Sequence, residues 1–152
     1  MAYVQLYTHM VFRTYNSQPY LTEEPRNALE RYVRGITEKL GIYLHAIGGV
    51  PDHIHLLLGL PPTLSVAEAA QKLKANTSRL LNRNGDMSER FRWREGYGAF
   101  SVSPGHLQQI KRYIDRQVEH HRKVTSDDEL ERILALYGLE DTLIRKRGEY
   151  AD

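Results

Sequence analysis

The pattern of hydrophobic and polar positions in the first part of the chain follows the periods of one helix and three strands. Residues 3–13 are rich in β-branched and aromatic side chains, which is typical of a strand. In residues 22–40 the apolar positions recur at every third or fourth residue, which predicts a helix with a threonine N-cap and a glycine after its end. Residues 42–49 and 52–60 are two strand-like runs joined by a short proline-containing turn, so we expect an antiparallel pair.

The next part of the chain predicts a helix, a strand and a helix in turn. Ser65 and Glu68 form a capping box ahead of apolar residues at helical spacing, which predicts a helix through Asn82. Residues 91–102 then form a strand region that two glycines interrupt. The Ser-Pro pair at 103–104 predicts the start of another helix.

The order of these elements, β-α-β-β-α-β followed by a helix, is the ferredoxin-like split βαβ pattern of an α+β fold. In that fold an antiparallel four-stranded sheet has two helices on one face, so the added helix can cover the other face. A second capping box predicts a further helix over residues 126–138. We therefore expect one domain, in which residues 1–124 form the main part and residues 125–152 form a C-terminal helical extension.

Composition restricts the class of protein. With 152 residues, of which 41% are hydrophobic and 26% charged, the chain fits one soluble globular domain. It has no cysteine, which excludes disulfides and thiolate metal sites, so nitrogen and oxygen atoms would have to hold any metal. Neither a signal segment nor an apolar run of about 18 residues occurs, which predicts a cytoplasmic protein that does not bind membranes. No glycine-rich phosphate loop is present, which argues against a nucleotide cofactor.

The formal charge of +2 permits nucleic-acid binding without indicating it, so the placement of basic residues matters more than their number. In the strand region, Phe91 and Trp93 alternate with three arginines that would share one face: Arg90, Arg92 and Arg94. On the polar face of the second helix, Asn76 is aligned with three further basic residues: Lys72, Arg79 and Arg83. Both sets are candidate contacts to DNA phosphates, and the alternative is an ordinary solvated charged face.

His53 and His55 form the first candidate site. They are two residues apart on a predicted strand, so their imidazoles project from the same face, with Cα atoms roughly 6.5–7 Å apart. This geometry suits chelation of one cation, and the alternative is two rings that only bond to their neighbours. The run lacks the Asp-His continuation of a metallo-hydrolase cluster and the two further ligands of a structural zinc site. His9, on the first predicted strand, has no assigned role.

Tyr113 and Gln117 form the second candidate site. Their helix has an apolar stripe that would seat it on the sheet, made of Leu107, Ile110, Ile114 and Val118. At positions i and i+4 the two side chains point the same way, about 6 Å apart along the axis. A metal held by Gln117 could therefore lie next to a phosphate attacked by Tyr113. Spacing alone favours the simpler interpretation of a half-buried aromatic and a surface glutamine.

Three segments, in this order, resemble those of a known family: residues 49–57 (GVPDHIHLL), 96–103 (GYGAFSVS) and 113–121 (YIDRQVEHH). From about Thr8 to about Lys123 the chain is similar to HUH-type one-tyrosine transposases. The likeness is to the insertion-sequence 200/605-like enzymes and their relatives associated with repetitive extragenic palindromes (REP). The resemblance joins the two candidate sites into one.

The resemblance implies a role for each of these four residues. His53, His55 and Gln117 would bind Mg²⁺ or Mn²⁺. Tyr113, on what would be an added catalytic helix, would attack DNA. Two histidines one turn further along could approach the metal or the phosphate, with capping or packing as the alternative role: His120 and His121.

The implied function is transposition of DNA. Tyr113 would cleave single-stranded DNA to give a 5′-phosphotyrosine and a free 3′-OH, and a second 3′-OH would reverse the attack and join new strands without ATP. Hairpin or palindromic DNA ends would be the partner, at the nucleoid, and the protein would act as a homodimer or as a monomer. One alternative is a domesticated single-stranded nucleic-acid-binding protein or REP-processing endonuclease that no longer mobilises an element. Another is a phosphodiesterase that uses water and tolerates Tyr113→Phe.

Overall fold

The computed structural model of the protein describes residues 2–117 and, beyond them, residues 132, 133, 135 and 137. The chain divides into two units, Met1–Gln117 and Val118–Asp152. The helices and strands named below all belong to the first unit. Of the helices that the structure describes, none combines the length and the apolar character needed to cross a membrane.

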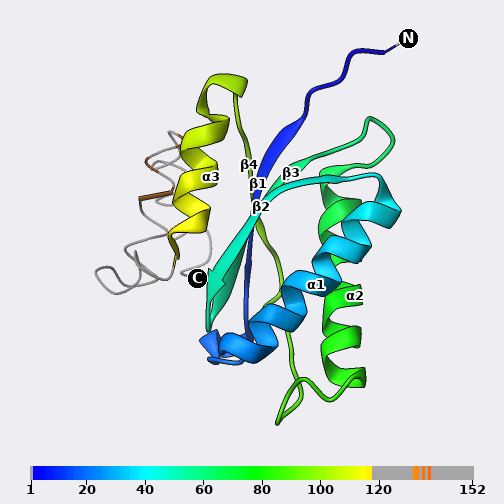
Figure 1. Ribbon diagram of the computed structural model, residues 1–152, viewed down its shortest axis with the longest axis vertical. Coiled ribbons are helices and arrows are strands. Elements are labelled where there is room, and N and C mark those ends of the chain that lie inside the picture. Colours follow the sequence, from blue (N-terminus) through cyan, green and yellow to red (C-terminus); the bar gives the residue numbers. More distant parts are fainter. Residues whose placement is uncertain (1, 118–131, 134, 136, 138–152) are drawn as a thin grey trace, which may run out of the picture. The chain divides into compact units, whose positions relative to one another are not determined.

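A four-stranded antiparallel sheet lies at the centre of the first unit, with the strand order β2-β3-β1-β4. Its strands are β1 (Tyr7–Arg13), β2 (Tyr43–Val50), β3 (His53–Gly59) and β4 (Gly98–Ser101). Two long helices cover one face and a shorter helix covers the other (Figure 1); they are α1 (Glu23–Leu40) and α2 (Val66–Arg83), with α3 (Leu107–Asp115) opposite. Short 3-10 helices follow β1 and precede α3: η1 (Tyr15–Ser17) and η2 (Pro104–His106). This arrangement confirms the ferredoxin-like α+β prediction.

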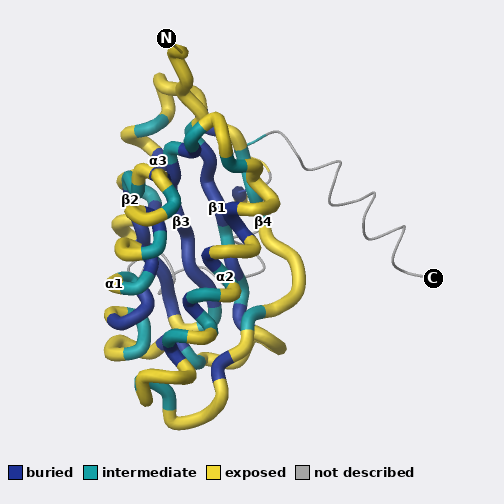
Figure 2. The backbone as a smooth tube through the Cα atoms, turned by 90° about the vertical axis from the view of Figure 1, so that its right-hand side faces the viewer, coloured by how far each residue is buried: buried dark blue, intermediate teal, exposed yellow. Residues whose placement is uncertain are grey.

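The inner strand β3 is buried on both faces because helices cover both sides of the sheet (Figure 2). Successive side chains of a strand point to opposite faces, so β3 separates two environments. One set packs in the hydrophobic core with α1 and α2: Ile54, Leu56 and Leu58. The other face of the same strand carries His53 and His55 beneath α3. The strand thus places two polar rings in a buried setting.

The helix ends follow the predicted capping signals. The backbone N–H of Glu68 donates to Oγ of Ser65 at 3.1 Å, and α2 begins directly after this serine. Gly41 ends α1 in the left-handed conformation, with φ of +71°, which glycine adopts at little cost. Thr22 precedes α1 as predicted, although its side chain makes no capping hydrogen bond.

The strand region predicted over residues 91–102, with interruptions at two glycines, is a regular strand only in its second half. Only β4 forms a regular strand, apart from a single bridge at Trp93. Before β4, Lys74 of α2 donates two hydrogen bonds of 2.7 Å, to the carbonyl oxygens of Arg94 and Gly96. Gly96 has a φ of +84°. Because these two carbonyl groups accept hydrogen bonds from a lysine, they do not accept hydrogen bonds from β1, and the strand is interrupted there.

Three predictions concern residues that the structure does not describe. They are the pair His120 and His121, the boundary after residue 124, and most of the helix over residues 126–138. Of that predicted helix, the structure describes residues 132, 133, 135 and 137. The first three are helical, and Tyr137 lies in a turn. These interpretations stay predictions.

Candidate active site

Two buried histidines lie side by side on the α3 face of β3. His53 and His55 are 3% and 0% exposed, and their ring centroids are 5.1 Å apart. In the sheet, His55 pairs with Val11 of β1 on one side and with Gly48 of β2 on the other. Both rings project from one face, as their spacing of two residues predicted.

Each of these histidines uses Nδ1 in a hydrogen bond. Nδ1 of His53 lies 2.7 Å from Oδ1 of Asp52, and Nδ1 of His55 lies 2.9 Å from Nε2 of His9. An ionised carboxylate can only accept, so Nδ1 of His53 donates to Asp52. The Nε2 atoms of both rings are buried as well, and an imidazole nitrogen that carries no proton can bind a cation through its lone pair.

The sequence analysis missed both partners of the histidines. Asp52 directly precedes His53, so the sequence itself could have suggested that the two side chains interact. His9 pairs with Leu57 and therefore lies diagonally across from His55, a placement that depends on the register between β1 and β3.

A glycine on β2 lets α3 approach the sheet next to these rings. A Cβ atom added to Gly48 would lie 2.3 Å from the carbonyl oxygen of Ile114. That distance is far below van der Waals contact, and the clash is with helix backbone, which cannot move aside alone. Ile110 and Ile114 form the buried side of α3. Because Gly48 pairs with His55, the close approach of the helix falls beside the histidines.

Tyr113 of α3 packs against two histidine rings, and Gln117 follows just after the end of this helix. The Tyr113 ring stands nearly perpendicular to that of His55, with centroids 5.7 Å apart, and its centroid is 6.5 Å from that of His9. Gln117 is 1% exposed, so it is not the surface glutamine of the simpler interpretation. Its amide nitrogen donates to the carbonyl oxygen of Tyr113 at 3.3 Å, and its buried amide oxygen accepts no hydrogen bond from the part of the chain that the structure describes.

The chemistry of these donors fits a divalent cation. Two imidazole nitrogens and one amide oxygen are neutral ligands of the kinds that first-row divalent ions and Mg²⁺ accept. A buried amide oxygen without a hydrogen bond costs free energy, and a bound cation would offset that cost. Within residues 2–117 and the four described beyond them, no group of three or more His, Cys, Asp or Glu could hold a metal. Among the residues that the structure describes, Gln117 could complete the set with His53 and His55.

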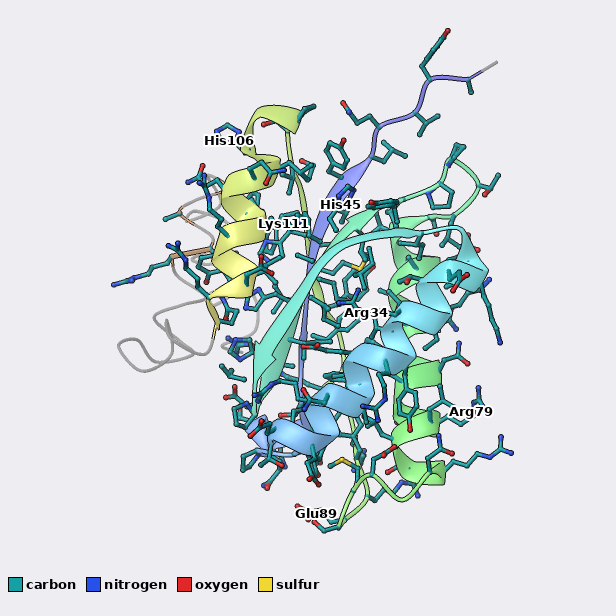
Figure 3. All side chains as sticks on the ribbon, in the orientation of Figure 1. Arg34, His45, Arg79, Glu89, His106 and Lys111 are labelled. Carbon is teal, nitrogen blue, oxygen red and sulfur yellow. The ribbon has the colours of Figure 1, made fainter. Side chains whose placement is uncertain are left out.

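A basic groove runs between α2 and the chain that leads to β4. It consists of two hollows of about 750 and 460 Å³ that share Ala75, Ser78 and Arg90. Five of the six predicted DNA-binding residues line it: Arg79, Arg83, Arg90, Arg92 and Arg94. Lys72 is exposed on α2 but does not line it. Figure 3 shows the Arg79 side chain extending from α2 away from the sheet.

An aromatic ring that the sequence analysis missed lies in this groove. Tyr15 is 38% exposed, and the guanidinium carbon of Arg92 lies 4.1 Å from its ring centroid. Lys74 lines the same hollow, where burial lowers its pKa and the charge of Glu95 opposes that shift. Exposed rings and guanidinium planes are surfaces on which nucleobases stack, so the groove combines positive charge with a stacking platform.

Known proteins are similar in sequence to this chain. Residues 2–117 match the family model described as "Transposase IS200 like". The ISDra2 transposase TnpA of Deinococcus radiodurans is 26% identical over 118 residues, which cover 74% of this chain and 84% of that protein. The transposase for insertion sequence element IS200 of Salmonella typhimurium is 29% identical over 119 residues, which cover 75% of this chain and 78% of that protein.

Two solved structures also resemble this one. A Deinococcus radiodurans protein assigned as a transposase superposes with a TM-score of 0.61 at 27% identity, over 77% of this chain and 95% of that chain. A REP-associated tyrosine transposase bound to a REP hairpin superposes with a TM-score of 0.62, over 82% of this chain and 73% of that chain. The second pair is 13% identical, so that likeness concerns the fold alone.

Proposed function

Because the chain belongs to the IS200-like transposase family, we propose that it cleaves and rejoins single-stranded DNA at hairpin-bearing ends, with Tyr113 as the nucleophile. Family membership makes the protein a transposase and hence an enzyme that cuts DNA. The observation that supports the finer proposal is one juxtaposition. The Tyr113 ring lies 5.7 Å from the buried ring of His55, and Gln117 follows one helical turn later.

Tyr113 supplies the attacking atom. Its phenol oxygen bonds to the phosphorus while the bond from phosphorus to the 3′ oxygen breaks, and the phenol proton passes through solvent to the departing 3′ oxygen. The products are a 5′-phosphotyrosine and a free 3′-OH. Because the new link is again a phosphodiester, a second 3′-OH can attack it and restore the tyrosine. Strands are thereby exchanged without ATP.

His53, His55 and Gln117 are the residues that would hold Mg²⁺ or Mn²⁺. A bound ion supplies Lewis-acid polarisation of the phosphate and stabilises the charge that develops on it. The three ligands are neutral, so they bring no negative charge of their own next to an anionic phosphate. The hydrogen bond of 2.7 Å that Nδ1 of His53 donates to Asp52 fixes the ring of His53, and burial excludes bulk water from both imidazoles.

The groove beside α2 is the proposed surface for the part of the DNA that is not cleaved. Its arginines neutralise phosphates without reading bases, and Tyr15 offers a ring for stacking. Lys72, which lies outside the groove, is the least favoured of the predicted contacts.

Arg90→Ala is expected to weaken binding of single-stranded DNA whatever its sequence, because Arg90 lines both hollows. Loss of one phosphate contact should reduce the slope of log affinity against log salt by about 0.7. Fluorescence anisotropy at several salt concentrations measures this slope. Arg34→Ala, which removes an exposed arginine from α1, is the matched control and should keep the wild-type slope (Figure 3). Equal slopes for the two variants would contradict the proposal that the groove binds DNA phosphates.

The proposed reaction can be tested directly by trapping its intermediate. The full chain is incubated with Mn²⁺ and labelled single-stranded hairpin oligonucleotides, and covalent adducts are mapped by mass spectrometry. We expect one adduct, on Tyr113, joined to the 5′ end of the cleaved DNA. Cleavage without an adduct, or an adduct on another tyrosine, would overturn the proposal.

Gly48→Ala is expected to lower the cleavage rate by roughly 10²-fold, the cost of misplacing reacting groups by about 1 Å. The added Cβ would push the Ile114 carbonyl, and with it the helix that carries Tyr113, away from the sheet. The fold should survive, because overpacking typically costs about 1–3 kcal/mol. Gly35→Ala is the control, since its Cβ meets nothing within 4 Å. Cleavage kinetics measure the rate, and thermal unfolding shows whether the fold survives. A wild-type cleavage rate for Gly48→Ala would refute the prediction.

A further inference from the structure

His9 is a buried histidine to which neither the motif nor the proposed reaction assigns a role. It is 0% exposed and lies on β1, which pairs with β3 on one side and β4 on the other. Its Nε2 lies 2.9 Å from Nδ1 of His55, and this bond is buried. His9 therefore contacts the proposed metal ligand His55 at Nδ1, and Nε2 of His55 is the atom that would bind the cation.

The direction of this hydrogen bond follows from what a metal ligand requires. A neutral imidazole carries one proton, on Nδ1 or on Nε2. Coordination through Nε2 of His55 needs the lone pair of that atom, so the proton must be on Nδ1. Nδ1 then donates, and Nε2 of His9 has to accept. We propose that His9 is a positioning residue, which holds His55 in the Nδ1–H tautomer with Nε2 ready for the cation; this inference rests on the proposed metal site.

The packing around His9 suits such a role. Phe100 of β4 and Tyr113 of α3 contact its ring at centroid distances of 6.0 and 6.5 Å. The ring is thus held between two aromatic neighbours while it reaches His55. The equivalent partner of His53 is Asp52, a carboxylate, so the two proposed ligands are oriented by different chemistry. A neutral imidazole acceptor orients its ligand without adding negative charge beside the phosphate site.

The test separates the hydrogen bond from packing by two substitutions. His9→Phe keeps a flat ring without an acceptor, whereas His9→Gln offers an amide oxygen in place of the ring. Calorimetric titration of Mn²⁺ into each full-length protein, without DNA, measures affinity. We expect the Phe variant to bind about 10- to 100-fold more weakly, the usual effect of removing an outer-shell partner, and the Gln variant to stay close to wild type. His106→Gln, at an exposed histidine of η2, is the control and should leave the affinity unchanged.

The outcomes distinguish this inference from the proposed function. If the wild-type chain binds no Mn²⁺, the proposed metal site fails and the inference falls with it. If the wild-type chain binds and His9→Phe binds equally well, or if only His9→Gln loses affinity, the positioning role alone is overturned.

A second measurement needs no substitution at His9. Long-range ¹H–¹⁵N spectra of the wild-type chain saturated with diamagnetic Mg²⁺ report which nitrogen of each imidazole carries a proton. We expect a protonated Nδ1 in His55 and a proton-free Nε2 in His9. The opposite tautomers would overturn the inference even if His9→Phe failed to fold.

Discussion

Tyr113→Phe is expected to abolish the covalent DNA adduct and strand joining while DNA stays bound. The substitution removes only the phenol oxygen and keeps the ring that packs against His55 and His9. Loss of an enzymatic nucleophile can cost roughly 10⁶-fold in rate, so product should fall below detection. Denaturing gels show the adduct, and transfer of a labelled strand to a free 3′-OH in Mn²⁺ shows the joining.

A second tyrosine variant makes this result specific. Tyr3→Phe changes a side chain that is 93% exposed and should retain the adduct and the joining activity of the wild-type protein. Cleavage that continues in Tyr113→Phe without an adduct would identify water as the nucleophile, and the protein would then be a phosphodiesterase. Persistence of the adduct would place the nucleophile on another side chain.

His55→Ala is expected to slow cleavage by roughly 10³-fold in saturating Mn²⁺, and chelation of the wild-type protein with EDTA should have a similar effect. Metal ions contribute several kcal/mol to the stabilisation of such transition states, and each 1.36 kcal/mol corresponds to a factor of ten in rate. DNA affinity measured without metal should change little, because the proposed binding groove lies beside α2. Cleavage rates as a function of Mn²⁺ concentration measure the effect.

The control for this substitution is another histidine of the same sheet. His45 lies on β2 and contacts the rings of Tyr7 and Tyr43, and burial together with the charge of Lys111 lowers its pKa. His45→Ala should keep the response to Mn²⁺. If His55→Ala also kept it, with an unchanged unfolding temperature, the cation would have to be held by other residues.

Local patterns were enough to predict most of the fold, whereas the two candidate sites were joined into one by the family resemblance. Side-chain alternation in β3 placed His53 and His55 on one face, and helical spacing placed Tyr113 and Gln117 together. The capping box at Ser65 predicted the start of α2 to the residue. These features depend on neighbours within a few positions, which is the range over which a sequence pattern carries information.

The parts that could not be predicted depend on distant segments. The contact between His9 and His55 requires the register of β1 against β3. The need for glycine at position 48 appears only when the distance from α3 to the sheet is known. Two glycines indicated an interruption before β4, but the hydrogen bonds that Lys74 donates there come from a different element. Each feature is a tertiary contact that no local period encodes.

The sheet separates the tyrosine from the basic groove. Tyr113 lies on α3, and α2, which lines the groove, covers the opposite face of the sheet (Figure 1). The chain that leads to the edge strand β4 forms the other side of the groove. A single strand of DNA that occupied both places would have to pass around the sheet. The distance from the groove to Tyr113 is fixed by the fold, so the DNA between these two places always has to span the same length. The cut is then expected at a set number of nucleotides from the anchored segment, whatever the bases between them.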